Sequence, residues 1–264
     1  MSVRYDLRSA MYVGLGWIVA VALLGLWQVY ATSADLLYLS SFTDAVSAAW
    51  SLVTQDSLTA DVLPSIGRFL AGYAIGCAVG VAVGIPVGYI RALEPWVRPV
   101  LEFLRSLPAP AIVPIAVLLL GATSWTRIAV IAFGSCWAVL LNAIDGARGV
   151  DPLLIDTGRV NRLGTMELLR RIVFPAALPQ IFAGLRIALG IALIVMVFSE
   201  MIASTSGLGF QILTSQRRFL VPETYGGVLL IGLIGWAFSV MFLFVERRVL
   251  SWHIGRLGGA QRGQ

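Results

Sequence analysis

Long apolar stretches separated by short polar connections make up most of this chain. A helix needs about 20 mostly apolar residues to cross the hydrocarbon core of a bilayer. Stretches close to that length cover residues 11–31, 66–90, 97–120, 127–144, 181–203 and 226–245. The pattern therefore predicts an all-α integral membrane protein with six transmembrane helices.

The segment 151–179, between the fourth and fifth apolar stretches, differs from the rest because it holds seven charged residues. Asp151 followed by Pro152 predicts a helix start, since aspartate caps a helix and proline is favoured in its first turn. We expect this helix to run to about Arg162 and to present charged side chains at its far end.

A second short helix should follow within the same segment. Gly164 interrupts the first helix, and Thr165 is placed to cap the second, which has one apolar face. We expect Pro175 and Pro179 to end that helix and to lead into the fifth span, because proline lacks the N–H that a helix interior requires.

Composition supports a membrane protein, since 58% of the residues are hydrophobic and only 12% are charged. Soluble globular domains are about one quarter charged. The 264 residues accommodate the expected spans in one polytopic domain, 1–264, with a core of about 60–250 and a charged loop at 147–180.

The arginines predict which side of the membrane each connection faces. An intracellular N-terminus places 15 of the 19 arginines on the cytoplasmic side, a strong positive-inside bias. The N- and C-termini and the segment 151–179 are then cytoplasmic. The arginines left on the outer side are Arg68, Arg127, Arg217 and Arg218.

Several kinds of chemistry are excluded or disfavoured by the residue types present. The chain contains no lysine, so it has neither the lysine of a Walker A phosphate-binding loop nor a Schiff-base amine. Cys77 and Cys136 lie inside apolar runs and are interpreted as core residues. His253 stands without clustered ligands, so a metal site is not expected.

The second apolar stretch contains a glycine at every fourth position. Residues four apart share a helix face, so these glycines form a shallow groove that another helix can approach closely. Close helix packing and a sliding surface during gating are both compatible with the pattern. The glycines are Gly72, Gly76, Gly80, Gly84 and Gly88.

Polar residues inside the spans are candidates for a translocation path or gate. Glu102 and Arg105 lie one helical turn apart and could pair, and Pro108 should break or kink the third span. Asn142 lies near the end of the fourth span. Glu200 either lines the pathway or outer gate, or is a helix-end acid bonded to the loop that follows.

Together these segments resemble a known family, the permease subunits of binding-protein-dependent ABC importers, and most closely the nitrate/sulfonate/taurine type. The charged segment is similar to their cytoplasmic EAA loop. The resemblance covers roughly residues 42–244 and adds the segments 64–72 (PSIGRFLAG), 104–108 (LRSLP), 175–179 (PAALP), 184–186 (GLR), 199–201 (SEM) and 206–209 (SGLG).

The resemblance implies a type I importer permease whose loop forms a coupling helix that docks on a cytoplasmic ATPase subunit. The loop departs from the family pattern, because its Glu-Ala-Ala triplet reads Asp-Thr-Gly and its usual glycine is an arginine. We expect Gly164 to provide the turn instead. The implied coupling residues are Asp156, Thr157, Gly158, Arg159, Arg162 and Gly164.

The implied partners are a second copy of this chain, two copies of the ATPase and an extracytoplasmic binding protein that delivers a small solute, such as a sulfonate or nitrate. ATP and Mg²⁺ would bind the ATPase, and this chain would catalyse no reaction and bind no nucleic acid. The resemblance places the protein in the cell membrane of a prokaryote.

Two other classes remain open from the sequence. A self-contained secondary transporter would need internal repeats with paired broken helices, and the two halves show no convincing repeat. A membrane-embedded enzyme would need clustered histidine, cysteine or acidic residues at membrane depth, and Glu200 is not part of a cluster in the sequence.

Overall fold

A computed structural model describes residues 3–34, 36–54 and 57–251, which form helices and their connections without any strand. His253 lies outside this described part of the chain. Contacts group the chain into two compact units, residues 1–58 with 211–231 and residues 59–210 with 232–264. The prediction of one domain, with a core of about 60–250 and a loop of 147–180, stays a prediction.

The first unit is held together by aromatic side chains around Trp27. Its indole N–H donates to the Ser40 carbonyl at 3.1 Å, and its ring lies 5.5 Å from that of Phe42 and 6.0 Å from that of Tyr225. The helices of this unit are α1 (Val3–Ala34), α2 (Phe42–Thr54), most of α10 (Leu208–Arg217) and the first part of α11 (Val221–Val249).

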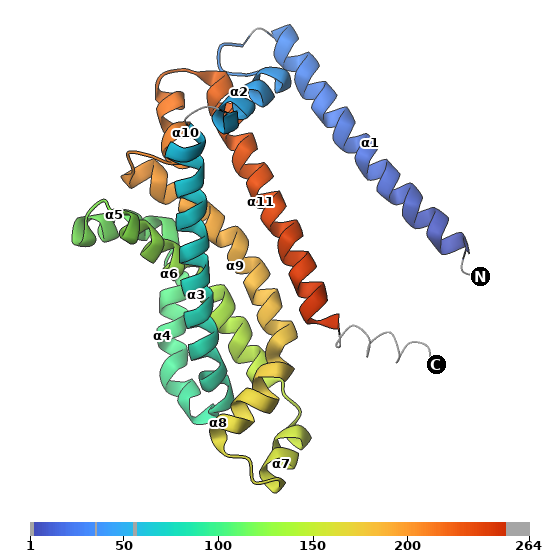
Figure 1. The fold of residues 1–264 in the computed structure, drawn as a ribbon, viewed down its shortest axis with the longest axis vertical. Helices are drawn as coiled ribbons and strands as arrows, with labels where there is room; N and C mark the ends of the chain where they lie inside the picture. Colours follow the sequence, from blue (N-terminus) through green and yellow to red (C-terminus); the bar gives the residue numbers. More distant parts are fainter. Residues whose placement is uncertain (1–2, 35, 55–56, 252–264) are drawn as a thin grey trace. The chain divides into compact units, whose positions relative to one another are not determined.

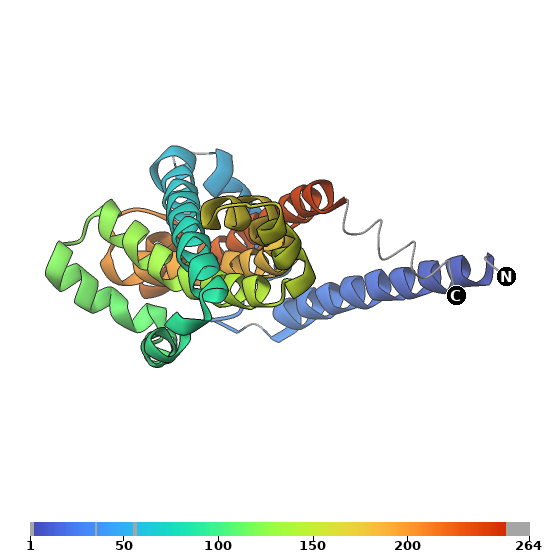
Figure 2. The same ribbon diagram turned by 90° about the horizontal axis from the view of Figure 1, so that it is seen from below.

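Three long helices form the centre of the second unit and run side by side (Figures 1 and 2). They are α3 (Leu63–Tyr89), α6 (Ser124–Arg148) and α9 (Phe174–Ala203). Their shared core is apolar and includes Phe69, Ile131, Val195 and Met196, each at most 2% exposed. The apolar periodicity of the spans therefore buries one side of each helix against the other two.

The glycines of α3 lie against α6 along the full length of the contact. A Cβ atom added at Gly80 would lie 2.9 Å from the carbonyl oxygen of Cys136, and one at Gly84 would lie 2.7 Å from that of Leu140. Gly72, Gly76 and Gly88 face α6 in the same way. The two backbones are therefore close enough that no larger side chain fits between them.

The third predicted span is broken into two helices, as its prolines indicated. The helices α4 (Glu94–Ser106) and α5 (Ala109–Leu120) meet at an angle of 90°. The break falls at Leu107 and Pro108, which have extended backbone conformations and leave α5 to begin at Ala109. Figure 2 shows α4 nearly end-on, with α5 running away from it.

The charged segment forms two helical pieces, and its second half differs from the prediction. The elements are α7 (Pro152–Val160), α8 (Thr165–Leu168) and the π-helix η3 (Leu169–Val173). The helix does not end at Pro175 and Pro179, because α8, η3 and α9 continue without a break from Thr165 to Ala203. The π turn shifts the hydrogen-bond register directly before Pro175, which accommodates the missing N–H.

The count of membrane spans agrees with the sequence pattern. Among the described residues, five helices are long and apolar enough to cross a bilayer, and the bent pair α4–α5 makes a sixth if it is taken as one span. Two short helices, η1 (Leu58–Val62) and η2 (Arg91–Leu93), flank α3. The structure is therefore all-α, with five or six apolar helices.

Replacing Gly80 with leucine should prevent assembly of this helix bundle. The added side chain would meet backbone atoms of α6, which cannot move aside without separating the two helices. Gly67→Leu is the matched control on the same helix, because no atom lies within 4 Å of the Cβ position there. The yield of monodisperse protein in detergent should fall for Gly80→Leu only, and equal yields would contradict the close-packing role.

Candidate functional site

A buried ion pair joins α3 to α9 at the end of the bundle opposite α7. Nη1 of Arg68 lies 2.8 Å from Oε1 of Glu200, a residue 132 positions away in the sequence. Arg68 is 8% exposed and Glu200 has no exposed surface. A charge buried in this way is stable only if it is both paired and hydrogen-bonded.

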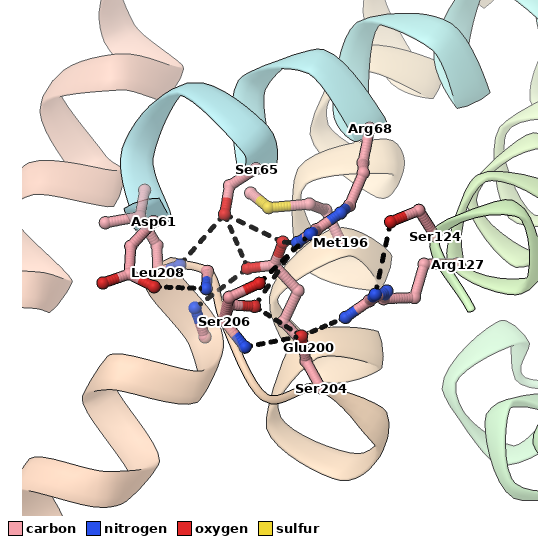
Figure 3. Close-up of polar contacts among 12 residues, drawn as sticks. Asp61, Ser65, Arg68, Ser124, Arg127, Met196, Glu200, Ser204, Ser206 and Leu208 are labelled. Carbon is pink, nitrogen blue, oxygen red and sulfur yellow. Dashed lines mark hydrogen bonds and ion pairs between the residues drawn. The ribbon is translucent and has the colours of Figure 1, made fainter. Parts of the chain in front are cut away.

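Further hydrogen bonds from α3 and the preceding π-helix complete the cluster (Figure 3). The hydroxyl of Ser65 lies 2.8 Å from both carboxylate oxygens of Glu200 and donates to them. Asp61, in η1, is 9% exposed. We refer to Asp61, Ser65, Arg68 and Glu200 as the polar clamp.

The polar clamp binds the beginning of α10. The N–H groups of three consecutive residues donate to it: Gly207 to Asp61 at 2.6 Å, Leu208 to Ser65 at 2.9 Å and Gly209 to Glu200 at 3.1 Å. The first N–H groups of a helix have no partner within that helix, and its N-terminus favours negative charge. The clamp therefore caps α10 with side chains from other elements.

The glycines of the segment 206–209 are required by this close approach. Gly207 has a φ of +116°, and a Cβ atom there would lie 2.5 Å from the carboxylate of Glu200. A Cβ atom at Gly209 would lie 2.5 Å from the carbonyl oxygen of Val197. Both positions therefore exclude a side chain, which accounts for the Gly-Leu-Gly sequence.

The beginning of α6 is tied to the same loop through Arg127, which is 7% exposed. Its guanidinium donates to the hydroxyl of Ser204 and, at 3.4 Å, to that of Ser124. The Ser204 hydroxyl in turn donates to the carbonyl oxygen of Ser206. Two arginines and two carboxylates thus surround the loop, and their formal charges balance.

Sequence reasoning identified Glu200 but missed its partners. Its two proposed roles were a pathway residue and a helix-end acid bonded to the following loop. The structure gives it a hydrogen bond from Gly209, at the start of α10, and an ion pair with Arg68 of α3. An acid at membrane depth needs a basic partner. The arginine count had already placed Arg68 and Arg127 on the side where Glu200 lies, which was the available signal.

The start of α7 has the cap that the sequence predicts. The side chain of Asp151 accepts a hydrogen bond from the N–H of Leu153 at 2.9 Å. Within the helix, Thr157 donates to the carbonyl of Leu153 at 2.7 Å, and Arg159 lies 3.2 Å from Asp156. The side chains of both members of that ion pair are more than half exposed.

Gly158 allows α7 to pack closely on the helix that follows it, and Ile155 of α7 packs against the apolar core cluster that includes Val173. Gly158 is buried, and a Cβ atom added there would lie 2.6 Å from Ile172 and 2.7 Å from Leu168. Leu153 and Val160, in contrast, are 70% and 82% exposed. The helix is therefore fixed on one side and presents a mixed apolar and charged surface on the other.

The turn after α7 differs from the expectation, because Gly164 does not provide it. Gly164 has an ordinary φ of −69° and precedes α8, so it stands in the capping position expected for Thr165. Arg162, at the position where the resembled family has glycine, has a φ of +58°. A residue with a Cβ is strained in this left-handed conformation. The turn therefore favours glycine at position 162, as in the resembled family, although this chain has arginine there.

The remaining candidates do not form one site with Glu200. Glu102 pairs with Arg98, four positions earlier, at 3.0 Å, and the described residues show no ion pair between Glu102 and Arg105. Asn142 accepts a hydrogen bond from Gln180 at 3.0 Å. Pro108 lies at the bend between α4 and α5.

A cavity of about 330 Å³ lies at the opposite end of the bundle from the polar clamp and brings together Glu102 and Arg105. Arg98, Asp145 and Arg148 also line it. The roles of all these candidates in translocation stay predictions.

Comparison with known proteins shows the family to which this chain belongs. The sequence pattern of the family described as "Binding-protein-dependent transport system inner membrane component" matches residues 76–251. A probable ABC transporter permease protein of Brucella melitensis is 30% identical over 92% of this chain and 100% of its own length. These matches cover most of the second unit, including Arg127 and Glu200.

The names of two other relatives specify a transported solute. A putative aliphatic sulfonates transport permease protein of Bacillus subtilis is 28% identical over 90% of this chain and 87% of its own length. A bicarbonate transport system permease protein of Synechocystis is 34% identical over 66% of this chain and 62% of its own length.

A solved structure shows the same fold. An inward-facing form of the MetNI methionine ABC transporter matches with a TM-score of 0.60 and 17% identity, over 72% of this chain and 94% of that one. The self-contained secondary transporter is not favoured by these matches. The chain is a multi-pass membrane protein that belongs to the family of binding-protein-dependent transport system inner membrane components, as a permease subunit of an ABC transporter.

Proposed function

We propose that two copies of this chain form the membrane pathway of an ATP-driven importer, with two copies of a separate ATPase bound at the α7 end. The observation that carries the proposal is α7 itself, a short helix that is capped by Asp151, packed through Gly158 and Ile155, and exposed on its other side. A rigid helix of this kind is suited to receive movement from a partner and pass it to the spans.

The orientation of the chain follows from its arginines. Arg159, Arg162, Arg170 and Arg171 belong to the α7 end, and the positive-inside bias puts this end and both termini in the cytoplasm. The polar clamp is then extracytoplasmic. ATP and Mg²⁺ bind the partner ATPase, so this chain supplies the pathway and the coupling surface, and catalyses no reaction.

The transported solute is a small anion, delivered by an extracytoplasmic binding protein. This class is supported by the relatives, whose names specify aliphatic sulfonates and bicarbonate. The direct test reconstitutes this chain with its cognate ATPase and binding protein in vesicles. Uptake of a labelled alkanesulfonate or of bicarbonate should require ATP, and uptake that continues without ATP would contradict the proposal.

Reversing the charge of Asp156 should uncouple ATP hydrolysis from transport. The ion pair of Asp156 with Arg159 is exposed, and such pairs contribute about 0–1 kcal/mol to stability, so folding should be unchanged. Asp156→Arg should reduce uptake per ATP hydrolysed by about tenfold, the effect of losing roughly 1.4 kcal/mol of interaction. Vesicle uptake measured together with phosphate release gives this ratio.

Glu167→Arg is the matched control for Asp156→Arg, because Glu167 forms a similar exposed pair with Arg171 on α8 and η3, outside α7. It should leave the ratio near that of the unmodified protein. A deletion of residues 151–162 should abolish coupling altogether. If coupling survives both Asp156→Arg and the deletion, α7 is not the docking helix.

Because the turn at Arg162 is strained, two uncharged replacements of this residue should differ in how well the protein binds the ATPase. Arg162→Gly removes the side chain at a φ of +58° and should leave assembly with the ATPase intact. Arg162→Val removes the same charge but places a β-branched residue in a conformation that it adopts poorly. Co-purification of the ATPase should fall for Arg162→Val only. Equal loss in both variants would assign the effect to the missing charge.

A further inference from the structure

One continuous helix, called the rod below, runs from the residues that contact α7 to the polar clamp. The elements α8, η3 and α9 run from Thr165 to Ala203, 39 residues in all. At 1.5 Å per residue its length, measured along the helix axis, is about 58 Å. Leu168 and Ile172, near its first end, contact Gly158 of α7, and Glu200 lies one turn before its other end.

The clamp is the place where this rod holds α3 and α10. Glu200 receives hydrogen bonds from Ser65 and Arg68 on α3 and from Gly209 at the start of α10. Separation of these elements would leave the buried charges of Arg68 and Glu200 without partners, a costly state. Movement of α9 should therefore carry α3 and the first turn of α10 with it.

The loop between α9 and α10 cannot transmit this movement by itself. It spans only the residues 204–207 and contains Gly207, whose backbone is intrinsically free to rotate. The contacts of the clamp with three consecutive N–H groups of residues 207–209 remove that freedom. Without them, the first turn of α10 would be connected to α9 by a flexible hinge.

We propose that Asp61, Ser65, Arg68 and Glu200 are positioning residues for transport, and that the clamp transfers movement received at α7 to α3 and to the beginning of α10. The clamp stays closed throughout the transport cycle and acts as a rigid joint. This inference rests on the proposed function, because it requires a partner that moves α7.

Two serines allow the same substitution to be compared inside and outside the clamp. Ser65 and Ser199 both have no exposed surface. Ser65 bridges Glu200 and the N–H of Leu208, whereas Ser199 donates to the carbonyl of Met196 within its own helix. Ser65→Ala therefore opens the joint between elements, and Ser199→Ala tests only the loss of a buried hydroxyl beside Glu200.

The experiment measures solute uptake per ATP hydrolysed by the complete complex reconstituted in vesicles, using a labelled alkanesulfonate and bicarbonate as probes. Ser65→Ala should lower this ratio roughly tenfold, on the scale of a hydrogen bond to a charged group, while ATPase co-purification and ATP hydrolysis are retained. Ser199→Ala should leave the ratio unchanged. A purely structural role would change the amount of assembled complex and leave the ratio constant.

A second pair of variants tests the charges. Glu200→Gln leaves Arg68 buried without its partner and should lower both assembly and the ratio. Combining it with Arg68→Gln removes both charges, which should restore assembly because no unpaired charge remains. The ratio should stay low, since amide groups hold the start of α10 less firmly than the charged pair does.

The outcomes separate this inference from the proposed function. An unmodified complex that takes up neither probe in an ATP-dependent manner contradicts the proposed function and the inference together. An active unmodified complex with an unchanged ratio in Ser65→Ala and in the doubly neutral variant overturns the inference alone. Failure of both variants to assemble, while Ser199→Ala assembles, would show that the clamp serves folding and would also overturn it.

Discussion

Hydrocarbon offers no hydrogen-bond partner, so every polar group buried in a membrane-embedded bundle must be satisfied by the protein itself. Glu200 meets this constraint in full. Its carboxylate accepts hydrogen bonds from a serine, an arginine and a backbone N–H that belong to two other helices. The relative positions of α3, α9 and the start of α10 depend on this one buried charge, since moving any of them would leave it unpaired.

A second constraint acts along the rest of the bundle, where lipid provides no hydrophobic drive for helices to associate. The glycines of α3 allow its backbone to approach that of α6 closely, and the gain is van der Waals contact along the whole interface. Close packing of α3 on α6 and the polar clamp between α3 and α9 together fix these three helices against one another.

The sequence predicted those features that depend on local chemistry. The cap at Asp151 and the break at Pro108 were both found where expected, because each depends on the residues next to it. Local reasoning was wrong about Pro175 and Pro179, since a π turn before them allows the helix to continue. It was also wrong about Gly164, because the left-handed residue of the turn is Arg162. Backbone register is a property of the folded segment, which residue types alone did not reveal.

In the candidate site too, some features could be predicted from the sequence and others depend on the folded structure. From the sequence, Glu200 was a charge in an apolar span that required an explanation, and membrane topology placed Arg68 and Arg127 on its side of the bilayer. The sequence did not show that Arg68 is the arginine paired with Glu200, nor that Asp61 and Ser65 cap α10. These contacts join residues more than 130 positions apart in the chain.

The sequence by itself determined the spans and the charged segment 151–179, because span length and charge distribution are linear properties of the chain, and its short motifs carried the resemblance to the family. Only the tertiary structure decided the partners of Glu200 and the continuous rod that joins it to α7. Hydrogen bonds and ion pairs form between atoms a few ångströms apart in space, and the linear order of residues does not encode that distance.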